Sequence, residues 1–73
     1  MKCLEDYTIV SRREDNGTYS ANVPAISGCY AWGRTRADAL SELDHVFDMI
    51  REEYEELGRE LPEDVGVVIA RAS

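Results

Sequence analysis

The first third of the chain alternates between apolar and polar residues, a pattern typical of short strands with one buried face. Asn16-Gly17 favours a hairpin turn, because both residues tolerate a positive φ. Pro24 cannot donate to a strand ladder and Gly28 follows closely, so a second turn is expected there. The pattern therefore predicts an antiparallel three-stranded meander with strands at residues 3–11, 18–23 and 29–32.

The alternation also assigns faces within the first two strands. Tyr7 and Ile9 share one face of the first strand. Tyr19, Ala21 and Val23 share one face of the second, since side chains two apart lie on the same side of a strand. Thr8 and Val10 share the other face of the first strand, and Ser20 and Asn22 alternate with the apolar residues of the second.

Apolar residues then recur at three- and four-residue steps, which predicts one long helix of about 22 residues. Thr35 with Asp38 resembles a capping box at its start, and Gly58 fits the position just past its end. Gly33 separates this helix from the third strand. The expected core stripe comprises Ala37, Leu40, Leu43, Phe47, Ile50, Tyr54 and Leu57, widened by Val46 and Met49.

A nearly all-apolar run closes the chain and predicts a fourth strand at residues 65–70. The expected fold is therefore a single α+β domain over residues 1–73 with the order βββαβ. Such an apolar strand on a domain this small also favours self-association, as a dimer or a multiple of a dimer.

The charge is distributed unevenly along the 73 residues, whose formal net charge is −7. Residues 1–36 carry four acidic and five basic residues, whereas residues 37–64 carry eleven acidic residues and only Arg51 and Arg59. An acidic helix repels phosphate, so direct nucleic-acid binding is not expected there. A basic protein partner would be attracted. The alternative interpretation is that these acids only keep the helix soluble.

The remaining composition makes several classes of site unexpected. Cys3 and Cys29 do not form a disulfide framework, and without a signal peptide a cytoplasmic location is expected. One histidine and two separate cysteines cannot supply a tetrahedral zinc site without carboxylates. No apolar run approaches the ~20 residues of a membrane helix. We therefore expect no cofactor, no metal and no membrane contact.

Three sets of residues suggest chemistry, but each has a simpler structural interpretation. His45 lies off the apolar stripe and has no evident catalytic partner. Cys29 follows a glycine near several arginines, although a buried structural thiol is the commoner case. A metal-dependent nuclease would use carboxylates, and the candidates are Asp6, Asp15, Asp38, Asp44 and Asp48, although an acidic segment produces such sets by coincidence. An anion or RNA contact would use arginines, and the candidates are Arg12, Arg13, Arg34 and Arg36, although solvated turns explain them equally simply.

A protein-binding surface is the better-supported candidate. Tyr30 and Trp32 alternate on a short strand with Arg34 beyond, and aromatic residues with arginine are typical of interface anchors. The alternative is that Trp32 covers the edge of the core. We predict a partner-binding set of Tyr30, Trp32, Arg34, Glu52, Glu55 and Glu56, and no catalytic residue.

The chain resembles the HicB-like antitoxin family over about residues 6–64. The resemblance rests on Val23-Pro24, Gly28-Cys29, Gly33, Thr35 and Ala39, placed between a hairpin and a long helix. With Asn16, Gly17 and Asp38 these residues form the expected structural motif. The family commonly has Asp-Leu-Pro-Gly-Cys where this chain has Ala-Ile-Ser-Gly-Cys at residues 25–29, so the turn keeps its glycine but loses its aspartate and proline.

The resemblance implies a partial RNase H-like fold and a partner. Known HicB-like antitoxins neutralise HicA toxins, which are small mRNA interferases, by covering them. Their full-length forms add a DNA-binding domain that represses their own operon. Because the sequence stops at Ser73, we expect neither that domain nor autorepression.

Three functions remain open from the sequence. The favoured one is a non-enzymatic binding module, an antitoxin or orphan relative that sequesters a small basic toxin. The second is a partial-RNase H-type nuclease or nucleic-acid-binding protein, which would need carboxylates converging on the sheet. The third is an oligomeric scaffold without a toxin partner.

Overall fold

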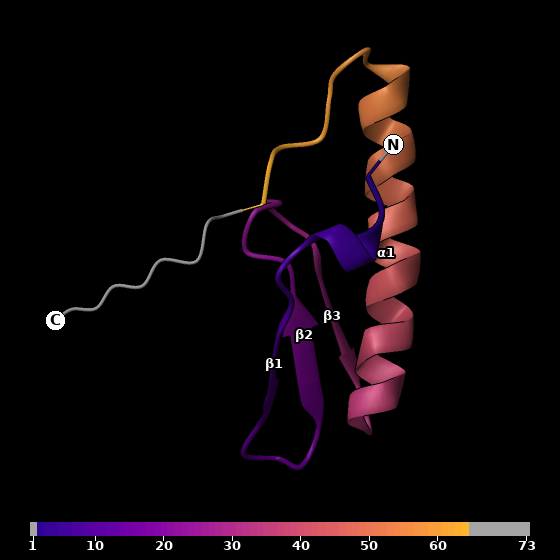
Figure 1. Cartoon of the computed structure of the whole chain (residues 1–73). Helices are drawn as coiled ribbons and strands as arrows, with labels where there is room; N and C mark the ends of the chain where they lie inside the picture. Colours follow the sequence, from indigo (N-terminus) through magenta and orange to yellow (C-terminus); the bar gives the residue numbers. More distant parts are fainter. Residues whose placement is uncertain (1, 65–73) are drawn as a thin grey trace, which may run out of the picture.

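The computed structural model describes residues 2–64 and has two layers, a sheet and one long helix (Figure 1). The sheet is an antiparallel meander in the order β1-β2-β3, as the alternation predicts. The helix α1 packs mainly against β3 and β2. The elements are η1, a 3-10 turn at Leu4–Asp6, then β1 at Val10–Arg13, β2 at Tyr19–Asn22, β3 at Tyr30–Gly33 and α1 at Arg36–Glu56.

The strand register gives the sheet a covered face and an open face. Ala21 of β2 lies opposite Ser11 of β1 and Ala31 of β3, and both alanines are buried beneath α1. The residues one position along face the other way, because side chains alternate across a strand. Among the described residues no element covers that second face.

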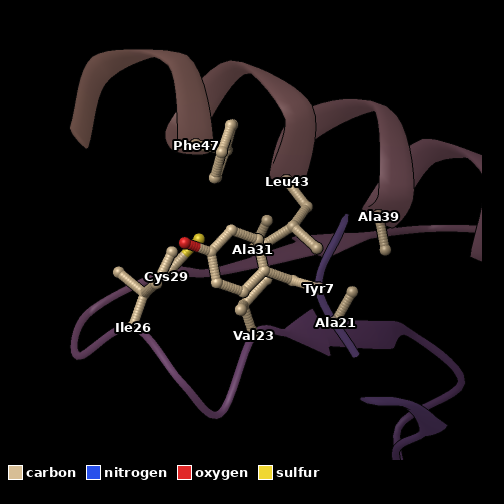
Figure 2. Packing of buried hydrophobic residues seen from close by; sticks show 9 residues of the cluster. All are labelled: Tyr7, Ala21, Val23, Ile26, Cys29, Ala31, Ala39, Leu43 and Phe47. Atoms are coloured by element: carbon tan, nitrogen blue, oxygen red, sulfur yellow. The ribbon is translucent and has the colours of Figure 1, made fainter. Parts of the chain in front are cut away.

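The core fills the space between the covered face and α1 (Figure 2). Leu43 and Phe47 project from the helix onto Val23, and all three are at most 1% exposed. The Tyr7 ring lies against the Phe47 ring, with centroids 5.9 Å apart. Each buried large side chain contributes on the order of 1.5–3 kcal/mol, so these few residues supply most of the stability.

The helix α1 begins and ends where the sequence predicts. The Thr35 hydroxyl accepts a hydrogen bond from the Asp38 amide at 3.0 Å, which caps the first turn. Gly58 has φ +69°, and its amide donates to the Glu55 carbonyl while the Arg59 amide donates to the Tyr54 carbonyl. These two bonds form a Schellman C-cap, which requires the left-handed conformation that glycine adopts easily.

The predicted turn residues also act as expected. Gly17 has φ +89°, and the Asn16 side chain accepts hydrogen bonds from the amide and hydroxyl of Thr18. Gly28 has φ +81° in the loop between β2 and β3, which Pro24 begins. The Ile26 side chain packs in the core and is 2% exposed, which holds this loop against the core. The turn therefore forms with Ala25 and Ser27 at the positions where HicB-like proteins commonly have aspartate and proline.

The predicted first strand is wrong over its N-terminal half. Residues 4–6 form η1 rather than a strand, because the Asp6 carboxylate accepts the Cys3 amide at 2.8 Å and closes a turn. Tyr7 and Ile9 still face the core, and the strand itself extends to Arg13. The third strand is displaced by one residue, since it runs from Tyr30 to Gly33 instead of from Cys29 to Trp32.

The predicted helix stripe is correct at its centre and wrong at its margins. Leu43 and Phe47 are buried, but Ala37 is exposed, and Met49 and Leu57 are 67% and 63% exposed. The buried position of the first turn is Ala39. The sheet is narrow, so α1 buries a stripe narrower than its apolar residues would allow.

The segment after α1 returns to the sheet and is held there by side chains. The Tyr7 hydroxyl donates to the Pro62 carbonyl at 2.5 Å, and the Asp64 carboxylate accepts from the amide and hydroxyl of Thr8 at 3.0 and 2.9 Å. Burial raises the pKa of the Tyr7 phenol, which keeps it a donor. The fourth strand predicted at residues 65–70 lies outside the described residues.

Candidate protein-binding surfaces

The open face of the sheet carries a group of exposed apolar side chains. Val10 of β1 and Tyr30 of β3 both lie opposite Asn22 of β2, so all three project from the open face. Trp32 lies opposite Ser20 and therefore projects the same way. Val10, Tyr30 and Trp32 are 43%, 59% and 55% exposed. Trp32 thus does not cover the edge of the core, and this group, the open-face aromatic patch, is available to a partner.

Polar side chains border this patch on the β1 side. The Ser20 hydroxyl donates to the Glu14 carboxylate at 2.8 Å, and the Arg12 side chain lies 3.6 Å from the same carboxylate. Arg34 follows β3 directly and is exposed. The open face is therefore apolar and mildly basic, and it lacks the negative charge of the helix.

The outer face of α1 carries the predicted acidic residues Glu52, Glu55 and Glu56, all exposed. The last turn of the helix contains no basic residue. Carboxylates there oppose the partial negative charge of the helix C-terminus, at about 0.3–1 kcal/mol each, and Glu52 and Glu56 repel each other at a four-residue spacing. These charges therefore lower helix stability instead of raising it.

Met49 is one of the surface residues that the sequence pattern misassigned to the core. It lines a shallow hollow of ≈ 330 Å³ on α1 together with Ile50, Glu52, Glu53 and Glu56. Its position on the helical wheel indicates this exposure, because Met49 lies at the margin of the apolar stripe, far from Leu43 and Phe47. The hollow combines an exposed thioether side chain with three carboxylates.

The predicted partner-binding residues are therefore not one site. Tyr30 and Trp32 lie together on the open face of the sheet, whereas Glu52 and Glu56 line the exposed hollow on α1. Figure 1 shows these two layers, the sheet and the helix, and the core fills the space between them. Glu55 lines a different hollow, described below. A small partner can contact the acidic helix or the aromatic patch, but it cannot cover both at once without wrapping around an edge of the sheet.

A second hollow, of ≈ 340 Å³, lies where the N-terminal segment passes the end of α1. Its three cations already have partners. Lys2 pairs with Glu63 at 3.1 Å, which raises the pKa of the lysine, while Arg51 pairs with Asp48 at 3.1 Å. The Arg59 guanidinium lies over the Tyr54 ring. The hollow is lined by Lys2, Arg51, Tyr54, Glu55, Arg59, Glu60 and Leu61.

The candidate chemical residues are dispersed. Burial raises the pKa of the Cys29 thiol, which favours the unreactive protonated form. His45 is exposed and lies 3.6 Å from Glu42 on the same helix. Asp6 is the last residue of η1, where its carboxylate accepts the Cys3 amide, and the Asp38 amide in the first turn of α1 donates to Thr35. Within residues 2–64 no three histidine, cysteine or carboxylate side chains are grouped so as to hold a metal ion.

The described helices include none that is both long and apolar enough to cross a membrane.

Comparison with known proteins gives one distant relationship. No family model matches the chain, and no solved structure matches it. The chain is similar to the UPF0150 protein Ta0767 of Thermoplasma acidophilum, with 29% identity over 58 residues. The match covers 80% of this chain and 84% of the relative, which is distant homology over nearly the whole domain. The chain is thus a small α+β protein, and a UPF0150 protein is its distant homologue.

Proposed function

We propose that this protein is a non-enzymatic binding module, a HicB-like antitoxin or an orphan relative of that family. Its partner would be a small basic protein such as a HicA-like toxin, and its binding surface would be the outer face of α1. The sequence motif from Val23 to Ala39 supports the family, and the distribution of charge and exposed apolar residues on α1 supports the surface.

The observation that carries this proposal is the exposed Met49 among the carboxylates of Glu52, Glu53 and Glu56. A solvated, purely polar helix face would not need an exposed methionine. Methionine adapts its shape to a partner and is frequent at binding surfaces. A basic protein with one apolar side chain would fill the hollow while its lysines or arginines meet the carboxylates.

The electrostatics of α1 support the same partner. The acidic residues of its last turn oppose the helix dipole, and a bound cation would relieve that repulsion. Long-range attraction would also speed association, since charges steer an encounter before contact. The glutamates would therefore accelerate association with the partner (the steering role), and Met49 would hold the bound partner in place (the anchoring role).

We expect a small basic protein to be encoded beside this gene, and association kinetics with that partner test the steering role. Changing Glu52, Glu55 and Glu56 to glutamine should slow association severalfold at low salt and flatten its dependence on ionic strength. A matched control changes Glu5 and Asp15, two exposed acids outside α1, to their amides. Equal association rates for the triple variant and wild type at low salt would contradict steering by α1.

The anchoring role is tested by dissociation rates in the same experiment. Met49→Ser should raise the dissociation rate about tenfold, as is typical of a desolvated apolar anchor, and Trp32→Ser should leave it unchanged. The opposite result would place the partner on the open-face aromatic patch and overturn the assignment to α1. A genome with no reading frame for a small basic protein beside this gene would remove the antitoxin proposal itself.

The non-enzymatic character has its own test. We expect no cleavage of single- or double-stranded RNA or DNA in the presence of Mg²⁺ or Mn²⁺, measured by gel assay with purified protein. Reproducible cleavage that is lost in Asp6→Asn while the fold persists would contradict the binding-module proposal and favour the nuclease alternative. Cys3→Ala, purified in the same way, is the control variant, because Cys3 lies next to η1 and close to Asp6 but contributes no carboxylate.

A further inference from the structure

The free edge of β3 presents main-chain groups that have no partner within residues 2–64. The Val23 amide donates to the Cys29 carbonyl at 3.0 Å, and these residues are directly opposite in the β2–β3 register. Hydrogen-bonded and non-bonded pairs alternate in an antiparallel ladder, so Ala31 bonds β2, whereas Tyr30 and Trp32 do not. The amides and carbonyls of Tyr30 and Trp32 therefore point away from the sheet.

The same reasoning applied to β1 shows how differently the two edges are protected. The Glu14 amide donates to the Thr18 carbonyl, so Ser11 and Arg13 direct their main-chain groups to the β1 edge. Arg12 and Arg13 place two like charges on that strand, and a second β1 strand beside it would be repelled. Charged side chains are a common protection of an edge, and β3 has neither charge nor proline.

We propose that β3 pairs with β3 of a second copy of this chain, antiparallel about a two-fold axis through Ala31. In this register Tyr30 lies opposite Trp32 of the second copy, and Trp32 lies opposite its Tyr30. All four outward-pointing main-chain residues are then in hydrogen-bonded pairs. The two three-stranded sheets become one sheet of six strands, with both α1 helices on the same face.

The side chains fit this register as well as the backbone does. Two Tyr–Trp pairs form on the open face, and cross-strand aromatic pairs are among the favourable pairs in sheets. On the covered face the axis passes between two Ala31 residues, so β3 itself places no large side chain at the axis there. The four rings form one continuous aromatic surface in the dimer, and the acidic outer face of α1 stays free. Loss of dimerisation would therefore leave partner binding at α1 intact.

Amide hydrogen exchange of the wild-type protein tests the pairing directly. The Tyr30 and Trp32 amides should exchange slowly at hundreds of micromolar protein and at least about tenfold faster on dilution, in step with the monomer fraction measured by sedimentation. The Ala31 and Gly33 amides, which bond β2, serve as internal controls and should stay protected at all concentrations. The Ser11 and Arg13 amides should show no dependence on concentration.

One variant and its control complete the test. Trp32→Lys should raise the dimer dissociation constant at least about tenfold, because it places a charge on the paired edge. Val10→Lys introduces the same charge on the same face at β1 and should leave dimerisation unchanged. A wild-type protein that stays monomeric at hundreds of micromolar would overturn the proposal. So would a dimer whose Tyr30 and Trp32 amides exchange rapidly, or whose β1 amides alone depend on concentration.

Discussion

Leu43→Asp is expected to unfold the protein. Leu43 has no exposed surface and contacts the centre of the core between α1 and the sheet. The substitution removes a buried side chain that contributes about 1.5–3 kcal/mol. It also buries a carboxylate without a partner, which costs several kcal/mol more. A domain of this length has on the order of 0.05–0.15 kcal/mol of stability per residue, so the combined loss is as large as its whole free energy of unfolding.

Circular dichroism and urea titration would measure this loss. Met49→Asp is the matched control, because it makes the same chemical change on the same helix at a side chain that is 67% exposed. It should leave helix content unchanged and shift the urea midpoint little. Lowering the pH should partly restore the Leu43→Asp fold, since protonation removes the buried charge. A folded Leu43→Asp protein at neutral pH would show that the core is not where the structure places it.

Gly33→Ala is expected to produce the second-largest loss. A Cβ atom at Gly33 would lie 2.7 Å from both the carbonyl carbon and the Cβ of Asp38, and closer still to the Ala39 amide nitrogen. These atoms belong to the first turn of α1, which is fixed by the Thr35 cap. The helix must therefore move away from β3. Forced overpacking of this kind costs about 1–3 kcal/mol, and Gly33→Val should cost more than Gly33→Ala.

The urea midpoint again measures the effect, with Gly17→Ala as control. A Cβ at Gly17 meets no atom within 4 Å, so only its positive φ opposes the change. That conformational cost is about 1–2 kcal/mol, and it does not grow with side-chain size as a steric clash does. If Gly33→Val is no more destabilising than Gly33→Ala, the close approach of α1 to β3 does not limit this position.

Alternation and helical spacing were sufficient to predict the meander, the long helix and both helix ends. These features are local, because Thr35, Gly58 and Asn16-Gly17 each act through hydrogen bonds or dihedral angles within a few residues. The strand boundaries were less well predicted. Residues 3–6 have strand-like neighbours, but the Asp6 carboxylate closes a turn that a period-two pattern does not reveal.

The surfaces required the tertiary structure. Leu57 matches the helical period, and only its place at the C-terminal end of α1 leaves it exposed. Met49 lies at the margin of the apolar stripe, and the limited width of the sheet beneath α1 leaves it exposed. The sequence likewise places Trp32 and Glu52 in one list of partner-binding residues. The layered packing puts them on opposite sides of the core. Which face of an element is covered depends on contacts between distant segments, and no local pattern encodes it.

The sequence by itself thus determined the elements, their order, the turn glycines and the excess of acid on α1. The tertiary structure decided which apolar residues are buried, which strand edge is unprotected and how far apart the charged and aromatic surfaces lie. The physical reason is that secondary structure follows from hydrogen bonds and dihedral preferences of neighbouring residues. Exposure instead follows from how two layers of limited width cover each other.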